Sequence, residues 1–476
     1  METTDGTVDS TVDGLAAGFS GVRAEFNLPT QFPAAALAEA EKAVANRRFD
    51  DRADATDLPL VTIDPPGSKD LDQALYVETR PDGFRLYYAI ADLGTFVQPD
   101  GALDAEVRRR GQTIYLPDGN VPLHPPVLSE GAASLLPGQV RPSALWTIDL
   151  DADGEPTQIS VRRALVRSIA QFDYDGVQAT LDAGNPHPSI AALPALGRLR
   201  REHAVRRGAV DLQLPEQEVA SDGNGGWMLT LRPRNDVDAW NAEMSLLTGM
   251  SAASLMIDAG IGVLRTLPEP DDGAVEWLRR SARSLGISWP KTASVAEVLA
   301  ELEPRSPESL ALYMDATRLL RGAGYTSFDG GLPELTTHAG VGAAYAHVTA
   351  PLRRLVDRFG AEICLAVSAG QAVPDWVRAV LPELPGLMDG SDSLASKVDK
   401  ACLDQAESWV LADRVGQEFD AVVLRAEASA AEVFLAEPPV IAKCSGENLP
   451  EGGRIRVRLL DADTVKRKVS FERVEN

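Results

Sequence analysis

The hydrophobic pattern of this chain changes twice along its length, and these changes limit the folds that it can adopt. From about Leu58 to Val166, apolar residues alternate with polar ones in runs such as LPLVTID, ALYVET and FRLYYAIADLGTFV. Such alternation, broken by PDG and DADG turns, is typical of strands. Helical periodicity then continues to about residue 415, after which short strand-like runs with glycine turns return. We therefore predict an α+β fold.

Three segments are expected, because a chain of 476 residues exceeds the size at which a single core usually stops growing. Residues 1–49 form an acidic tail followed by a helix in FPAAALAEAEKAVANRRF. Residues 50–415 form a large core, a mixed sheet wrapped by helices. A stretch rich in proline and glycine, 372–392, should separate that core from a last helix at about 393–415. Residues 416–476 have the pattern of a small five-stranded barrel.

Composition indicates a globular protein of a reducing compartment. The hydrophobic fraction is 44%, and the three cysteines, Cys364, Cys402 and Cys444, show no CxxC spacing, which argues against a disulfide framework and a zinc cluster. The N-terminus lacks the basic and then apolar pattern of a signal peptide, and no run approaches the roughly 18 apolar residues of a membrane span. We expect a cytoplasmic monomer without a membrane partner. No protein partner is predictable.

The formal net charge of −24 bears on whether the chain can bind nucleic acid. Phosphate binding normally requires a basic surface, so the acidity by itself favours a protein without an RNA partner. An acidic exterior can nevertheless enclose a locally basic channel. Composition leaves both alternatives open, and the motifs have to decide between them.

The segment VTIDPPGSKDLDQAL, residues 61–75, is the most informative one. Asp64 ends a β-branched run, and a loop with proline and glycine leads to Asp70 and Asp72. Residues two apart in an extended segment face the same side, so these two aspartates point together while Leu71 faces the core. Three converging carboxylates repel one another unless a hard cation such as Mg²⁺ neutralises them. A solvated acidic turn, or a calcium-stabilised loop without chemistry, fits the spacing equally well.

These residues resemble a known signature. IDPPGSKDLDQA is similar to the motif of the RNB ribonucleases, of the ribonuclease II and ribonuclease R type, which is an aspartate, five residues and then Asp-x-Asp-Asp. Similar segments follow in the family's order: YAIADLGTFV, RRRGQTIYLPDGNVPLHPPVLSEGAASLLPG and AYAHVTAPLRRLVDRF. The resemblance covers about residues 50–415 and implies an RNB catalytic core. The C-terminal barrel resembles the S1 module of the OB-fold class. A bacterial form is implied in which the first 50 or so residues leave no room for the usual two cold-shock domains.

The resemblance implies a 3′-to-5′ exoribonuclease that hydrolyses single-stranded RNA to nucleoside 5′-monophosphates with Mg²⁺ as its cofactor. Asp64, Asp70 and Asp72 match the catalytic carboxylates that hold the metal. Tyr115 matches the tyrosine that stacks on the 3′-terminal base, and Arg353 matches the arginine that clamps the scissile phosphate. Outside such motifs, a tyrosine between aliphatic residues is more often a sheet residue, and paired arginines at a helix start are usually solvated.

Two weaker matches concern the ribose. Tyr174 and Glu243 fall where the family reads the sugar, and a carboxylate that accepts a hydrogen bond from the 2′-hydroxyl distinguishes RNA from DNA. An ordinary exposed helix position is the alternative for Glu243. We expect His347 to be structural, holding the loop before Arg353, and Arg354 to face elsewhere.

Two departures from the family pattern put catalysis in question. Gln73 stands where the family has a fourth catalytic aspartate, and an amide brings no charge. Leu403 stands at the position expected for an active-site glutamate, although Glu407 or Asp399, each one helical turn away, could replace that acid.

Three hypotheses therefore stay open. The favoured one is the exoribonuclease. The second is a catalytically weak or inactive RNA-binding protein with an RNB fold. The third is a scaffold whose acidic surface binds proteins, which leaves the tyrosine and arginine motifs unexplained. In the barrel, Lys466, Arg467 and Lys468 suggest phosphate contacts.

Overall fold

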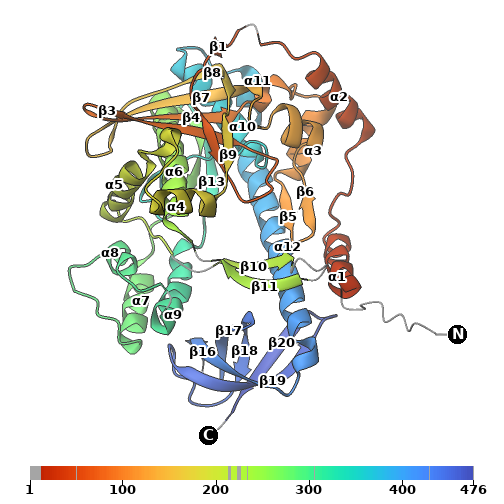
Figure 1. The fold of residues 1–476 in the computed structure, drawn as a ribbon, viewed down its shortest axis with the longest axis vertical. Coiled ribbons are helices and arrows are strands. Elements are labelled where there is room, and N and C mark those ends of the chain that lie inside the picture. The colour runs from red at the N-terminus through yellow and green to blue at the C-terminus, as the bar shows by residue number, and fades with distance from the viewer. Residues whose placement is uncertain are drawn as a thin grey trace, which may run out of the picture.

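Figure 1 shows a long molecule with a large core at one end and a small barrel at the other. The computed structural model describes residues 12–49, 51–212, 216–221, 227–232, 234–304, 306–427 and 429–474. Helix α12 (Leu384–Leu411) runs from the core to the barrel. The predicted α+β fold is confirmed. Within the described residues, no helix is long and apolar enough to cross a membrane.

A seven-stranded mixed sheet forms the centre of the core. Neighbouring strands are antiparallel except for the pairs β1–β8 and β2–β9, which are parallel. Trp146 and Tyr88 lie fully buried on it. The predicted strand runs between Leu58 and Val166 are confirmed as β2, β3, β4, β7 and β8, whereas β1 and β9 lie outside the predicted range. In sheet order the seven strands are β1 (Ala53–Asp54), β8 (Pro156–Arg167), β7 (Val140–Asp151), β4 (Gly83–Ala91), β3 (Gln73–Arg80), β2 (Val61–Ile63) and β9 (Ala170–Phe172).

Helix α6 (Asp236–Ala259) is the central helix of the core, packed on α4, α5, α10 and β12. A capping box between Asn235 and Asp238 begins it, and Gly260 ends it in the left-handed conformation. The other core helices are α3 (Ala102–Arg110), α4 (Tyr174–Asp182), α5 (Leu193–Arg206), α10 (Leu355–Ser368) and α11 (Asp375–Val380). The short strand pairs are β5 (Ile114–Leu116) with β6 (Gly119–Val121), β12 (Ile261–Thr266) with β13 (Gly324–Asp329), and β14 (Thr337–His338) with β15 (Ala343–Ala344).

A helical insertion lies between β12 and β13. It comprises α7 (Asp272–Ser284), α8 (Val295–Ala300) and α9 (Pro307–Ala316), which share an apolar cluster of their own. Helix α9 also contacts the first strand of the C-terminal barrel. The insertion therefore links the core to the barrel along one side of the molecule (Figure 1).

The expected break at 372–392 is wrong, because α11 and the first turns of α12 occupy it. Pro385 lies in the first turn of α12, where a missing N–H costs no helical hydrogen bond. Leu384 and Met388 are fully buried, so packing holds the helix despite its glycines.

The N-terminal segment contains two helices where one was expected. Helix α2 (Ala34–Ala45) confirms the predicted one. Helix α1 (Val12–Glu25) was missed, although Leu15, Phe19 and Val22 have the i, i+4, i+7 spacing of an apolar helix face. Short acidic and glycine-bearing stretches around these residues hide that pattern. Residues 1–11 of the predicted tail lie outside the described part.

The C-terminal barrel is closed, as predicted, in the order β16-β17-β18-β20-β19. Arg467 in its β19–β20 turn pairs with Glu25, and Lys466 pairs with Asp463. The guanidinium of Arg467 already bonds a carboxylate, and the phosphate role suggested for Arg467 stays a prediction. The strands are β16 (Glu418–Ala426), β17 (Ala430–Ala436), β18 (Pro439–Ser445), β19 (Arg454–Asp463) and β20 (Lys468–Arg473).

A hairpin of β10 (Glu216–Ser221) and β11 (Trp227–Arg232) lies along α12 between the core and the barrel (Figure 1). The buried carboxylate of Glu407 on α12 joins these parts. Its Oε1 accepts hydrogen bonds from the Gln217 side chain at 2.8 Å and from the Ile441 backbone N–H at 3.0 Å. Burial raises the pKa of Glu407 to about 7.

Replacing Glu407 by glutamine should stabilise the folded protein above neutral pH. The folded state holds the Glu407 proton more tightly than the unfolded state does, so this group's stabilisation is present below about pH 4.5 and is lost as the pH rises to about 7. Glu407→Gln keeps both acceptor contacts without the buried charge. We expect the free energy of unfolding to increase by roughly 1–3 kcal/mol at about pH 8 and to change little at about pH 4.5.

Thermal unfolding at the two pH values measures this difference. Glu407→Ala is the control, because it leaves both donors without a partner and should destabilise the protein at either pH. If Glu407→Gln melts at a lower temperature than the unmodified protein at about pH 8, the charge of the Glu407 carboxylate itself stabilises its contacts with the hairpin and the barrel.

Candidate active site

Residues 64–72, which carry Asp64, Asp70 and Asp72, form a loop that we call the carboxylate loop. It begins where β2 ends. All three residues of β2 are buried, and the backbone N–H of Asp64 donates to the Phe172 carbonyl at 3.0 Å, which extends the pairing with β9. A turn through Pro65 and Gly67, whose φ is +81°, then reverses the chain. The β2–β9 edge therefore fixes Asp64 at the carboxyl end of a buried strand.

The loop is anchored at Leu71, which is fully buried as predicted. Its N–H donates to Ser134 Oγ at 3.0 Å, and the Ser134 hydroxyl donates to the Lys69 carbonyl at 2.6 Å. The predicted burial of Leu71 is confirmed, but of its two neighbours Asp70 is partly exposed whereas Asp72 is buried.

Asp72 reaches the second half of the core. Its Oδ1 accepts a hydrogen bond from the Leu352 backbone N–H at 2.7 Å, and its Oδ2 lies 4.0 Å from Arg353 Nε. The Leu352 carbonyl in turn accepts from His124 Nδ1 at 3.1 Å, and burial lowers the pKa of His124 to about 4, so that its ring is neutral. Both polar groups of the Leu352 backbone are thus held.

The loop that carries Arg353 is held on its other side by Asp357. The Asp357 carboxylate accepts from the Ala350 N–H at 2.7 Å and binds the Arg354 guanidinium at 2.5 and 2.8 Å. Arg354 therefore faces elsewhere, as predicted. The Arg353 side chain is 49% exposed and points toward Asp72, so it is the guanidinium of this loop that an anion can reach.

Tyr115 lies at the same place. It is the middle residue of β5, between the buried Ile114 and Leu116, and its own side chain is 48% exposed. Its hydroxyl donates to Asp70 Oδ2 at 3.0 Å. Beside it, the Thr113 N–H donates to the Arg353 carbonyl at 2.9 Å. The structure thus brings together the aspartates, Tyr115 and Arg353 from three distant segments.

Burial and mutual repulsion set the electrostatics of the carboxylates. Burial, and next the charge of Asp70, raise the pKa of Asp64 to about 7, while Arg353 opposes this shift. Burial also raises the pKa of Asp72 well above its usual range, opposed by Arg353 and by the Leu352 N–H, and Asp70 adds to the increase. Asp70 is therefore the carboxylate whose charge both others experience.

The chemistry of these residues fits a divalent cation, although the cluster is loose. Asp64 Oδ2 is buried without a hydrogen-bond partner, which a cation would satisfy, and positive charge would relieve the repulsion with Asp70. Among the described residues, however, no three Asp, Glu, His or Cys side chains form a group close enough to hold a metal ion. The predicted metal role of Asp64, Asp70 and Asp72 stays a prediction.

The side chain of Gln73 is held by two hydroxyl groups. Its Oε1 accepts hydrogen bonds from Tyr88 and, at 3.1 Å, from Ser245, and these hydroxyls lie 2.7 Å from each other. Tyr88 is on β4 and Ser245 on α6, so the sequence around Gln73 carried no sign of them. The amide oxygen, the only atom of Gln73 suited to a metal, is already used.

A cavity of about 1370 Å³ opens beside the loop, lined by Pro65, Tyr174 and Glu243. The Tyr174 hydroxyl accepts from Asn241 at 3.4 Å, and after burial the charge of Asp64 contributes most to the raised pKa of Tyr174. Tyr174 is therefore close to the carboxylates, and Asn241 is a polar neighbour that the sequence analysis missed.

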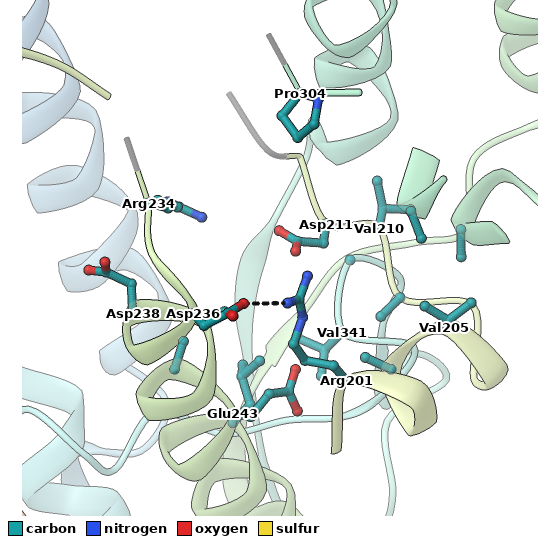
Figure 2. A pocket seen from close by; sticks show the side chains of 18 of the residues that line it. Arg201, Val205, Val210, Asp211, Arg234, Asp236, Asp238, Glu243, Pro304 and Val341 are labelled. Carbon is teal, nitrogen blue, oxygen red and sulfur yellow. Dashed lines mark ion pairs between the residues drawn. The ribbon is translucent and has the colours of Figure 1, made fainter. Parts of the chain in front are cut away.

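Glu243 lies on another face of α6, two residues or about 200° from Asn241. It is 6% exposed, its Oε2 has no hydrogen-bond partner, and it lies 3.8 Å from Arg207. Figure 2 shows it in the cavity beneath Arg201, which pairs with Asp236. The exposed helix position considered for Glu243 is thus wrong, and its ribose role stays a prediction.

The expectation for the last core helix needs correction. Leu403 packs against the apolar cluster of the barrel, and Glu407 binds the hairpin and β18, so neither lies at the carboxylate loop. Nearer its beginning, α12 carries Asp392, which accepts from Gln112 at 3.2 Å and pairs with Arg265 at 2.9 Å. It precedes Leu403 by about 16 Å of helix, and Asp399 lies exposed about two turns beyond it.

His347 has the structural role that was expected. It shares a 2.8 Å hydrogen bond with the Tyr325 hydroxyl, and burial together with Arg354 and Arg265 lowers its pKa. A neutral ring packed between Tyr325 and Tyr345 supports the loop before Arg353.

Comparison with known proteins identifies the family of this chain. The RNB domain model matches residues 52–363, well over half of the chain. The chain belongs to the RNB family. The model of the RNase II-type exonuclease C-terminal S1 domain matches residues 417–474, the closed barrel.

Curated relatives of this RNB protein include two ribonucleases R. That of Acidithiobacillus ferrooxidans is 37% identical over 198 residues, which cover 39% of this chain and 45% of the relative. That of Vibrio parahaemolyticus is 29% identical over 325 residues, which cover 64% of this chain and 38% of the relative. The matches span less than half of either relative.

Solved structures share the RNB fold over nearly the whole chain. The apo form of Mycoplasma genitalium RNase R superposes with a TM-score of 0.86 at 20% identity, covering 97% of this chain and 78% of that one. Yeast Ssd1, described as a pseudonuclease, has a TM-score of 0.71 at 15% identity, covering 96% and 58%. At these identities the likeness establishes the fold alone.

We expect the Ser134 hydroxyl to hold the backbone of the carboxylate loop in place. Ser134→Ala removes the acceptor of the Leu71 N–H and the donor to Lys69, which should lower the free energy of unfolding by about 1–3 kcal/mol. Amide hydrogen exchange of residues 67–72 should increase. Ser251→Ala is the control, since this buried hydroxyl donates to a carbonyl of its own helix. Equal exchange of the loop in both variants would mean that Ser134 does not anchor it.

Proposed function

We propose that this RNB protein is a 3′-to-5′ exoribonuclease that hydrolyses single-stranded RNA to nucleoside 5′-monophosphates with Mg²⁺. The observation that carries the proposal is the meeting of Asp70, Asp72, Tyr115 and Arg353, which come from three chain segments. The structure of Mycoplasma genitalium RNase R in complex with ribose methylated single-stranded RNA, at 20% identity, has the same fold and supports this substrate class.

The reaction adds water across the terminal phosphodiester bond. The hydroxyl of the water joins the phosphorus, the bond from phosphorus to O3′ breaks, and a proton ends on that O3′. The last nucleotide leaves as a 5′-monophosphate and the shortened RNA keeps a 3′-hydroxyl. Mg²⁺ held by Asp64, Asp70 and Asp72 would supply the activation of the water and the stabilisation of the leaving oxygen.

The side chains position the RNA end around that bond. Arg353, half exposed and next to Asp72, binds the scissile phosphate, for which a planar guanidinium is well suited. Tyr115 exchanges its contact with Asp70 for stacking on the terminal base, worth about 1–3 kcal/mol. Tyr174, which is bonded to Asn241, and Glu243, whose Oε2 accepts no hydrogen bond and lies 3.8 Å from Arg207, line the cavity where ribose hydroxyls would bind.

An assay with 5′-labelled single-stranded RNA tests the activity. With Mg²⁺ we expect shortening from the 3′ end, and removal of the metal by a chelator should stop it. Asp72→Asn should lower the rate ~100-fold or more, because it removes a charge from the carboxylate loop. Asp149→Asn is the control. It breaks the ion pair of Asp149 with Arg85 in the large sheet, which is not part of the proposed site, and this variant should cut RNA normally. RNA that is bound but not shortened by the unmodified protein would overturn the proposal.

A second candidate is an inactive RNA-binding protein of the same fold. Gln73 favours it, because its side chain carries no charge and its amide oxygen already accepts hydrogen bonds from Tyr88 and Ser245. The similar fold of yeast Ssd1, which is described as a pseudonuclease, supports this candidate. The two candidates differ in turnover and not in RNA binding.

Variants of Gln73 distinguish the effects of charge and length. Gln73→Asp is one methylene shorter, so its carboxylate cannot reach both hydroxyls and should lie nearer the carboxylate loop. We expect about a tenfold higher rate at limiting Mg²⁺, since one further charge strengthens metal binding. Gln73→Glu keeps the length and should remain bonded to Tyr88 and Ser245, with little gain. Gln73→Asn controls for length alone. Equal rates for Gln73→Asp and Gln73→Asn would place Gln73 outside the metal shell.

A further inference from the structure

Helix α1 lies outside both segments matched by family models, which cover 52–363 and 417–474. It nevertheless packs near the proposed site. Figure 1 shows α1 beside α12, close to the hairpin of β5 and β6 that carries Tyr115. The missed N-terminal helix therefore contacts a functional element.

The apolar face of α1 contacts the back of that hairpin. Leu15, Phe19 and Val22 share a buried cluster with Ile114 and Leu116, the two residues that flank Tyr115, and the cluster also includes residues of α12. Side chains alternate along a strand, so fixing Ile114 and Leu116 against α1 directs Tyr115 to the opposite face. That face is the one toward Asp70.

An ion pair fixes the tip of the hairpin. Asp118 lies in the turn between β5 and β6, and both of its carboxylate oxygens accept from the Arg23 guanidinium, at 2.7 and 2.8 Å. A bidentate pair restrains orientation as well as distance. Behind the hairpin, Arg110 donates to the carbonyls of Pro122 and Gln31, both at 2.9 Å, which ties its end to the segment that follows α1.

The other contacts of α1 hold it to the barrel and to α12. Glu25 pairs with Arg467 at 2.7 Å, and Arg467 donates to Gln405 at 3.1 Å. Gly18 faces Gln405 so closely that an added Cβ would lie 2.7 Å from that side chain. The helix is therefore fixed independently of the hairpin and can act as a support for it.

We propose that α1 is a positioning element that holds the β5–β6 hairpin so that Tyr115 stands over the carboxylate loop. Its positioning residues are Arg23, which acts through Asp118, and Phe19, which acts through the buried cluster that it shares with Ile114. The proposal rests on the proposed stacking of Tyr115 on the RNA 3′ end. It goes beyond that function because it assigns part of the RNA-end geometry to a helix outside the RNB and S1 segments.

Two measurements on the full chain test this. The first is amide hydrogen exchange of residues 114–121 without RNA, which reports the hairpin alone. Arg23→Ala should increase this exchange roughly two- to fivefold, the range of a partly exposed ion pair, and Phe19→Ala should increase it more. The double reversal Arg23→Asp with Asp118→Arg should restore protection. Asp149→Asn is the matched control, because the Arg85–Asp149 pair has similar exposure and lies in the large sheet.

The second measurement uses RNA with 2-aminopurine at its 3′ end, in Ca²⁺ instead of Mg²⁺ to limit turnover. At saturating RNA, stacking quenches the fluorescence, and we expect about half of the quenching to be lost in Arg23→Ala and nearly all in Tyr115→Ala. Asp149→Asn should quench as the unmodified protein does. A role limited to overall stability would change the melting temperature and leave quenching at saturation unchanged.

The outcomes separate the two proposals. Unchanged exchange of 114–121 in folded Arg23→Ala overturns the role of α1, whether or not Phe19→Ala folds. Full quenching in Tyr115→Ala overturns the proposed stacking of Tyr115 on the RNA end. The exchange of residues 114–121 still tests whether α1 holds the hairpin. Increased exchange with full quenching in Arg23→Ala shows that the hairpin is held by α1 but that Tyr115 needs no such support, which also overturns the proposal.

Discussion

The site depends on one hydrogen bond, from the Leu352 backbone N–H to the buried carboxylate of Asp72, 280 residues earlier in the chain. This contact joins the loop after β2 to the loop before α10. Burying a carboxylate is costly, and Arg353 and the N–H group offset part of that cost. Because the Leu352 carbonyl is bonded to His124 as well, the loop has little freedom. Arg353 and the strand of Tyr115 are then placed by the same backbone.

The acidity of the chain becomes compatible with an anionic substrate once the arginines are located. Many core guanidinium groups are bonded to carboxylates, so they contribute structure and little free positive charge. Arg353 differs, since its side chain is half exposed and lies 4.0 Å from a carboxylate that a cation would share. A local site of this kind can attract phosphate although the formal net charge is −24. Examples are the pairs of the buried carboxylates Asp92 with Arg52 and Arg163, Glu106 with Arg110, Asp104 with Arg358, and Asp357 with Arg354.

The long helix α12 explains how one chain connects sites that are far apart. Its first half contacts the core through Asp392, and its second half carries Leu403 and Glu407 to the barrel and the β10–β11 hairpin. Glu407 and Asp399, each one turn from Leu403, were considered as active-site acids. The acid of α12 that contacts the core, Asp392, lies about three turns before Leu403. The position of a residue along this long helix therefore decides whether its side chain contacts the core or the barrel.

The sequence by itself determined most of the strand and helix pattern, the closed barrel, and the burial of Leu71 between Asp70 and Asp72. Alternation and helical periodicity are local, so neighbouring residues suffice to predict them. Only the tertiary structure decided that Tyr88 and Ser245 bind Gln73, that Asn241 is the partner of Tyr174, and that α1 supports Tyr115. These contacts join residues far apart in the chain, and they follow from how whole elements pack, which no local pattern encodes.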